Sequence, residues 1–160
     1  MTVSGIQKSY YKATGFTLDS PIPVPGLLKI TAAAVTIVKG DAIFDDGSGL
    51  ATNANTAMAA TFMGIAACDC ASGGDCYIIP ASSNVRYWVV NSGATLAATT
   101  DIGEVIDLEE NNTVDVSDVT VTASGWGFFV DEIDVSAAAL AADNEIVTTG
   151  GFVKGHFVRT

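Results

Sequence analysis

Basic residues are scarce in this chain, which has 7 Lys and Arg against 18 Asp and Glu and a formal net charge of −11. A field of this sign repels the phosphate backbone of nucleic acids and anionic lipid headgroups. Long apolar runs are also missing, so no transmembrane helix is predicted. Tyr10, Tyr11 and polar residues stand where a signal peptide needs an apolar stretch. We therefore expect a soluble protein without an export signal that binds neither nucleic acid nor membrane.

Catalytic signatures are equally scarce. The only histidine, His156, lies in an apolar C-terminal segment, and no G-x-S-x-G motif accompanies it. Two pairs of carboxylates, Asp107 with Glu109 and Asp131 with Glu132, fall at expected strand ends and turns, where solvated charge is ordinary. The glycine pairs lack the frame of a phosphate-binding loop. The sequence predicts a structural histidine, no enzymatic activity and no cofactor.

Cysteine is limited to three residues, Cys68, Cys70 and Cys76. Their C-x-C-x5-C spacing matches no common zinc or iron–sulfur signature, and a zinc site would lack an obvious fourth ligand, so metal binding is not favoured. Cys70 and Cys76 flank an expected hairpin loop and could face each other at disulfide distance. The interpretation that we place first is that all three are small, free strand residues in a reducing cytoplasm.

Helix-favouring Glu, Lys and Arg are few, whereas Gly, Thr, Val and Ala are frequent. This composition predicts an all-β fold, a single small β-barrel or sandwich, over residues 28–160. The chain is 16% charged and 49% hydrophobic, so we expect some apolar surface to be buried against other chains, unless alanine merely inflates the count. Strands are expected at residues 27–38, 41–44, 50–53, 61–70, 76–80, 85–90, 104–108, 113–116, 125–132 and 152–158.

Residues 1–27 differ from the rest, because three of the four prolines fall within five positions there. Alternating prolines fix φ and remove amide donors, so this segment is predicted to be an extended, polyproline-like arm. One interpretation is a strap that reaches over a neighbouring subunit. The other is a tail folded back on its own domain, or a disordered leader. For the strap, the expected interface residues are Tyr10, Tyr11, Pro21, Pro23 and Pro25.

Two segments of the chain share one pattern at an offset of 63 residues. In the first copy Gly40-Asp41 opens an apolar stretch and Gly64 follows 24 positions after Gly40. In the second copy Gly103-Glu104 and Gly127 repeat this arrangement. We expect two related strand–turn–strand halves that close one barrel.

The same offset aligns Met63 with Trp126. The copies diverge after their last shared strand. There the first copy has a Gly73-Gly74 turn, and the second has an alanine-rich segment that predicts a short helix near residues 135–142. A partner would most plausibly be recognised where the two copies differ.

Four short motifs occur in order along the chain: Lys39-Gly40-Asp41-Ala42-Ile43-Phe44, Gly49-Leu50-Ala51-Thr52, Phe62-Met63-Gly64-Ile65-Ala66 and Gly151-Phe152-Val153-Lys154-Gly155. Through them the chain resembles, over roughly residues 38–158, the small capsid decoration (cement) proteins of tailed bacteriophages. The resemblance implies a β-barrel that binds the outside of an assembled head as a homo-trimer or other homo-oligomer and stabilises the shell.

The same resemblance implies the major capsid protein as a partner, and a place on the capsid exterior of the virion after synthesis in the host cytoplasm. The chain departs from the family pattern in its cysteine cluster, its long N-terminal arm and its predicted helix.

Other functions fit parts of the same sequence. Within virion proteins, a tail-tube or head-fibre subunit is the alternative. A carbohydrate- or surface-binding β-module would use Tyr87, Trp88 and Trp126 as a stacking platform, although both tryptophans are more simply core residues. A small metal-dependent enzyme or redox protein would use the three cysteines together with His156.

Overall fold

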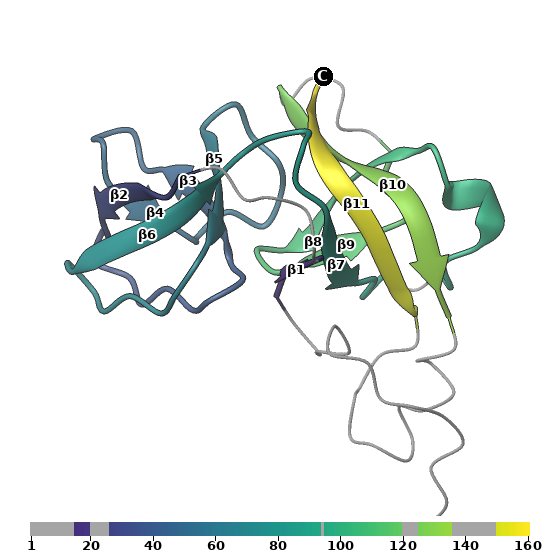
Figure 1. Cartoon of the computed structure of the whole chain (residues 1–160), viewed down its shortest axis with the longest axis horizontal. Helices are drawn as coiled ribbons and strands as arrows, with labels where there is room; N and C mark the ends of the chain where they lie inside the picture. Colours follow the sequence, from purple (N-terminus) through teal and green to yellow (C-terminus); the bar gives the residue numbers. More distant parts are fainter. Residues whose placement is uncertain (1–14, 20–25, 94, 120–124, 136–149) are drawn as a thin grey trace, which may run out of the picture.

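The computed structural model describes residues 15–19, 26–93, 95–119, 125–135 and 150–160. Over these residues the all-β prediction is confirmed, because the strands form two antiparallel sheets and the only helical element is one 3₁₀ turn, Thr99–Asp101 (Figure 1). The strands are β1 Thr17–Leu18, β2 Leu28–Thr31, β3 Ala42–Asp45, β4 Ala51–Thr52, β5 Phe62–Ala66, β6 Asp75–Pro80, β7 Tyr87–Val90, β8 Val105–Glu110, β9 Thr113–Asp115, β10 Trp126–Asp134 and β11 Phe152–Arg159.

Ten of these strands fall into two successive units with the same topology. The first unit has the spatial order β2-β6-β5-β3-β4, and the second has the order β7-β11-β10-β8-β9. Strand by strand the two orders are equivalent, so that β2 corresponds to β7 and β6 to β11. In Figure 1 the first unit lies at the left and the second at the right. The predicted repeat is thus part of a larger one, in which each copy builds its own five-stranded sheet.

A single parallel bridge joins the two outermost strands of each unit. Ala32, directly after β2, bridges Ala51 of β4, and Asn91, directly after β7, bridges Val114 of β9. In both units the N–H of the next residue then donates to the carbonyl of the same partner, at 2.8 and 3.0 Å. One bridge does not close a barrel, so the sandwich prediction fits, and the expectation that two halves close one barrel is wrong.

The 63-residue offset holds through the first hairpin of each unit. Phe44 of β3 pairs with Thr52 of β4, and Asp107 of β8 pairs with Asp115 of β9. Each residue of the second pair lies 63 positions after its counterpart in the first. Because strand register decides which side chains face the core, equal registers give the two hairpins equivalent inner faces.

Both copies open on the same backbone turn. Gly40 and Gly103 have φ angles of 93° and 94°, in a region that glycine adopts at little cost and other residues avoid. These glycines direct the chain into β3 and β8. The sequence pattern of a glycine before an acidic residue therefore marks a structural corner rather than a site of chemistry.

In the third strand the offset changes by one residue. Ile43 of β3 pairs with Gly64 of β5, whereas its counterpart Ile106 of β8 pairs with Phe128 of β10. Gly64 and Phe128 are 64 residues apart, one more than the offset of the first hairpins. Trp126 therefore corresponds to Phe62, and the predicted alignment of Trp126 with Met63 is wrong. The β3–β5 ladder contains a register shift next to Ile43, and a comparison at fixed offset does not detect such a local irregularity.

The main hydrophobic core is shared by both units. It joins Phe44 and Phe62 of the first unit to Phe128 and Phe157 of the second. The ring centroids of Phe62 and Phe157 lie 4.5 Å apart, which is close contact for two aromatic side chains. A smaller core lies within the first unit and contains Ala32, Ile37, Ile43, Ala51, Ala66, Cys70, Cys76 and Ile78. The two units therefore depend on each other for much of their burial.

Residues 15–18 of the predicted arm belong to the folded part of the chain. Phe16 is 5% exposed, and its ring lies near those of Tyr87, Phe128 and Phe157, at centroid distances of 6.1, 5.6 and 5.4 Å. β1 pairs antiparallel with β7 and adds a sixth strand to the second sheet. The part of the arm that the structure describes thus supplies both a core residue and an edge strand.

Two strands, β2 and β5, end well before their predicted ends. β2 ends at Thr31, not at residue 38, because Ala32 and the residue after it turn to β4. β5 ends at Ala66, not at residue 70. The helix predicted near residues 135–142 falls on residues 136–149 apart from its first position, and thus lies outside the described residues.

Candidate functional site

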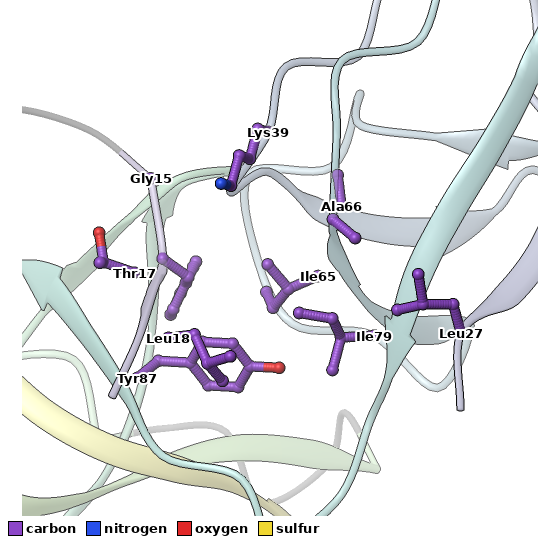
Figure 2. A pocket seen from close by; sticks show the side chains of 11 residues that line it. Gly15, Thr17, Leu18, Leu27, Lys39, Ile65, Ala66, Ile79 and Tyr87 are labelled. Carbon is purple, nitrogen blue, oxygen red and sulfur yellow. The ribbon is translucent and has the colours of Figure 1, made fainter. Parts of the chain in front are cut away.

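A cavity of about 450 Å³ lies where the N-terminal segment meets both units (Figure 2). Phe16 and Leu18, in and beside β1, line it on one side, and Ile65 of β5 and Ile79 of β6 line it on another. Tyr87 of β7 also lines it, and its ring lies next to Leu18 in the view of Figure 2. Three parts of the chain that are distant in sequence therefore build this cavity.

The lining is mainly aliphatic and has few polar groups. Burial raises the pKa of Tyr87 well above its ordinary value, so its phenol keeps its proton and acts as a hydrogen-bond donor or acceptor. Lys39 contributes an ammonium group to the lining, and its backbone N–H donates to a carboxylate oxygen of Asp69 at 2.8 Å. No histidine, cysteine or carboxylate is among the described lining residues. The cavity can hold an apolar group, and Tyr87 and Lys39 are the titratable side chains among its described lining residues.

A polar cluster on the second sheet contains His156. Its Nδ1 lies 2.8 Å from Oδ2 of Asp131, and Nε of Arg86 lies 2.9 Å from the same oxygen. The ring of Phe129 lies beside the imidazole, with centroids 5.0 Å apart. These contacts link β10, β11 and the residue before β7. The arrangement fits the predicted structural histidine, since one carboxylate contacts both the Arg86 guanidinium and the His156 ring across neighbouring strands.

Lys154 of β11 forms a second cross-strand contact. Its Nζ lies 2.7 Å from Oε2 of Glu132 and 3.6 Å from Oδ2 of Asp19. The hydrogen bond to Glu132 is the main reason that the pKa of Lys154 is raised. The ammonium also lies 5.5 Å from the ring centroid of Trp88. Lys154 thereby ties the end of the N-terminal segment to the face of the second sheet.

The three cysteines are free thiols, so the alternative of a Cys70–Cys76 disulfide is not what this structure has. Cys70 and Cys76 lie in the core of the first unit, and Cys68 is half-buried. Burial, followed by a hydrogen bond with Cys70, raises the pKa of Cys76 to about 12. A thiol of that pKa is protonated at neutral pH and is a poor nucleophile. The described residues contain no group of three or more His, Cys, Asp or Glu side chains placed to hold a metal ion.

The proposed aromatic platform does not exist on the surface. Tyr87, Trp88 and Trp126 are 2%, 6% and 9% exposed, so their faces pack inside the molecule and are not presented to a sugar ring. Trp126 additionally carries the guanidinium of Arg159 over its ring, at 4.3 Å from the centroid. The simpler interpretation of the two tryptophans as core residues is correct.

The carboxylate pairs have separate structural surroundings. Asp107 accepts hydrogen bonds from the backbone N–H groups of Met58 and Leu108, at 2.6 and 2.7 Å, and so joins the first unit to β8. Asp131 contacts Arg86 and His156, Glu132 forms an ion pair with Lys154, and Glu109 lies exposed on β8. Neither pair lines the cavity.

The five predicted interface residues, Tyr10, Tyr11, Pro21, Pro23 and Pro25, all lie outside the described residues. Sequence reasoning overlooked Phe16 and Leu18, which line the cavity. Phe16, Thr17 and Leu18 alternate between apolar and polar, which is typical of a half-buried strand. The prolines that follow led to the prediction of an extended arm over the whole N-terminal segment.

No protein-family model matches this chain, and no curated protein does either. Among the described residues no helix is long and apolar enough to cross a membrane.

Proposed function

We propose that this chain is a structural virion protein of a tailed bacteriophage, a decoration or cement protein that binds the outside of the assembled head and stabilises it. In this proposal its partners are the major capsid protein and further copies of itself, as a homo-trimer or other homo-oligomer, and it requires no cofactor. It is made in the host cytoplasm and ends on the capsid exterior.

The placement of the family-like motifs supports the proposal. Gly40-Asp41 opens β3, the segment around Gly64 is β5, and Gly151 leads into β11. These three motifs thus lie at corners and strands of the fold, as an architecture shared with that family would require.

The observation that carries the proposal is a set of exposed apolar side chains beside the open edge of the first unit. Leu27, Leu28 and Tyr77 are 53%, 42% and 39% exposed, and β2 and β6, which hold the last two, are neighbouring strands. In Figure 1 β2 lies at the left, on the side of the first unit away from the second, and β6 runs from there toward the second unit. Leu28 pairs with Ile78 and Lys29 with Tyr77, so the exposed side chains of Leu28 and Tyr77 lie on opposite faces of the sheet. Apolar side chains left exposed beside an open sheet edge favour burial against another protein. Repeated by the symmetry of a shell, such contacts give strong retention although each is weak.

A binding experiment with shells tests the proposal. Shells of the phage that encodes this chain, prepared without it, are mixed with the purified protein and sedimented. We expect the protein to co-sediment at a saturating ratio and to raise the temperature at which the shells lose integrity, also in the presence of a chelator. Shells that already carry their full complement are the control and should bind no more. Protein that stays in the supernatant, or binds without stabilising the shell, would contradict the proposal.

Immunogold labelling of whole virions separates the proposal from its closest alternative. Labels on the head surface are the expected result. Labels along the tail or on head fibres would instead identify the chain as a tail-tube or head-fibre subunit.

A further inference from the structure

The outer edges of β2 and β7 are equivalent in topology but differ in what covers them. β7 pairs on one side with β11 and on the other with β1. β2 pairs with β6, the counterpart of β11, and apart from the bridge from Ala32 to β4 no described strand lies along its other edge. An edge strand presents unpaired backbone groups that can accept a further strand. The second unit therefore shows, within the same molecule, how the edge of the first unit can be covered.

The bridges fix which residues correspond. Ala32 and Asn91 are equivalent, because each lies one residue after its strand and bridges the strand at the opposite edge of its unit. Counting back along both strands, Lys29 corresponds to Trp88 and Leu28 to Tyr87. Trp88 and Tyr87 are the residues that pair with β1.

Backbone direction shows that Lys29 faces the open edge. The N–H of Ala32 donates to the carbonyl of Gly74 at 2.8 Å, in the register of the β2–β6 ladder. Backbone groups alternate in direction along a strand, so those of Leu28 also point toward β6, and those of Lys29 point away from it. The N–H of Asp19 donates to the carbonyl of Arg86 at 2.9 Å, which by the same alternation directs the backbone of Trp88 to β1.

Side-chain burial gives the same contrast. Tyr87, whose edge is covered by β1, is 2% exposed, whereas its counterpart Leu28 is 42% exposed. Lys29 is the charged residue of this edge, and its Nζ lies 3.2 Å from a carboxylate oxygen of Asp75 on β6. The charge that commonly protects an edge from pairing is thus balanced locally, and an apolar side chain is left uncovered.

We propose that the outer edge of β2 binds residues 1–14 of a second copy of this chain as an added antiparallel strand. The N-terminal region already supplies such a strand to the equivalent edge of β7. Fourteen further residues precede Gly15, and an extended segment of that length spans roughly 46 Å at about 3.3 Å per residue, enough to reach a neighbouring molecule.

A sequence pattern indicates which part of this segment pairs. Ser4-Gly5-Ile6-Gln7 repeats the order of hydroxyl residue, glycine, apolar residue and polar residue found in Thr14-Gly15-Phe16-Thr17, which leads into β1. Ile6 would then take the position relative to β2 that Phe16 has relative to β7. Pairing of this kind depends on main-chain hydrogen bonds, with one or two apolar side chains providing specificity.

The inference deepens the self-association included in the proposed function, and its test uses the purified protein without shells. Sedimentation equilibrium compares the full chain with Lys29→Pro and Lys29→Ala. Both variants lose the ion pair with Asp75, but only proline removes the N–H that faces the open edge. We expect the full chain and Lys29→Ala to self-associate, and Lys29→Pro to show a dissociation constant at least about tenfold larger.

A labelled peptide with the sequence of residues 1–14 provides a second measurement. Fluorescence anisotropy should show it binding to a chain that lacks residues 1–14, and binding at least about tenfold more weakly when that chain also carries Lys29→Pro. Circular dichroism confirms that each variant keeps its β structure. Equal self-association and equal peptide binding by the Lys29→Pro and Lys29→Ala variants would overturn the inference, as would a full chain that stays monomeric at every concentration. Failure to bind shells, in contrast, would count only against the decoration role.

Discussion

Phe16 connects the N-terminal segment to the rest of the molecule. Its ring lies among aromatic side chains of the second unit, and its backbone N–H donates to the carbonyl of Gly40 in the first unit at 2.9 Å. We therefore predict that Phe16→Ala lowers the free energy of unfolding by about 3–5 kcal/mol, the usual cost of removing a buried phenylalanine ring. Urea unfolding followed by tryptophan fluorescence measures the change.

The matched control is an apolar residue outside the core. Val38 is 54% exposed, so Val38→Ala should change the free energy of unfolding by no more than about 0.5 kcal/mol. If Phe16→Ala is as stable as Val38→Ala, the N-terminal segment does not occupy the core in solution.

Because the thiol of Cys76 is buried, we predict that the free energy of unfolding falls at alkaline pH. Its pKa is raised from 9.0 to about 12 in the folded protein, so the unfolded chain loses the proton first as pH rises. The contribution of this thiol to stability is complete below about pH 9 and is lost progressively toward pH 12. The resulting slope is at most about 1.4 kcal/mol per pH unit for one group.

Replacing Cys76 tests whether its thiol causes this loss of stability with rising pH. In a reducing buffer, Cys76→Ala should unfold with a shallower loss of stability between pH 9 and pH 11 than the unaltered chain. Cys68→Ala changes a half-buried thiol and serves as the control. An identical slope in the unaltered and Cys76→Ala chains would show that Cys76 ionises as readily in the folded state as in the unfolded one.

At the scale of the elements, removal of the short strand β1 is predicted to lower the thermal stability. An arm that only reached over a neighbouring subunit could be removed without harm to the fold. Because β1 covers the edge of β7 and is followed by Asp19, which contacts Lys154, we now expect two different outcomes. A chain that starts at Gly15 should keep its thermal stability, and a chain that starts at residue 20 should melt at least about 4 °C lower.

Differential scanning calorimetry of the two truncated chains measures this difference. The chain that starts at Gly15 is the control, since it lacks the preceding residues but retains Phe16 and β1. Equal melting temperatures would mean that β1 adds nothing to the second sheet.

At the scale of the whole molecule, the two units share a topology but not an independent core. Phe44, Phe62 and Ile65 of the first unit are buried in the cluster that also contains second-unit residues. We predict that a fragment of residues 26–82, which holds the complete first unit, does not fold alone, because these apolar surfaces would be exposed to water. NMR spectra with poor dispersion and the absence of cooperative thermal unfolding are the expected results.

Co-expression with a fragment of residues 83–160 is the complementary experiment. If the shared core is the reason for the failure, the two fragments together should recover a cooperative transition that neither shows alone. A well-dispersed spectrum of the isolated first unit would show that its smaller core is sufficient for folding.

Several features followed from the sequence alone because they depend on short-range chemistry. The scarcity of helix-favouring charged residues and the alternation of apolar side chains predicted the strands, and the glycines before acidic residues marked where β3 and β8 begin. The single histidine contacts a carboxylate on the neighbouring strand, in keeping with its predicted structural role. These patterns are local, so the tertiary fold does not need to be known to recognise them.

Other features were decided by contacts between residues distant in the chain. The one-residue change of register in the third strand, the burial of Phe16 and the single bridge that joins the edges of each unit follow from how two sheets fit against one core. The sequence determined that the chain is all-β and contains a repeat. Only the tertiary structure decided that each copy builds its own sheet and that no strand of the described residues pairs along the outer edge of β2, because strand pairing depends on long-range register and packing.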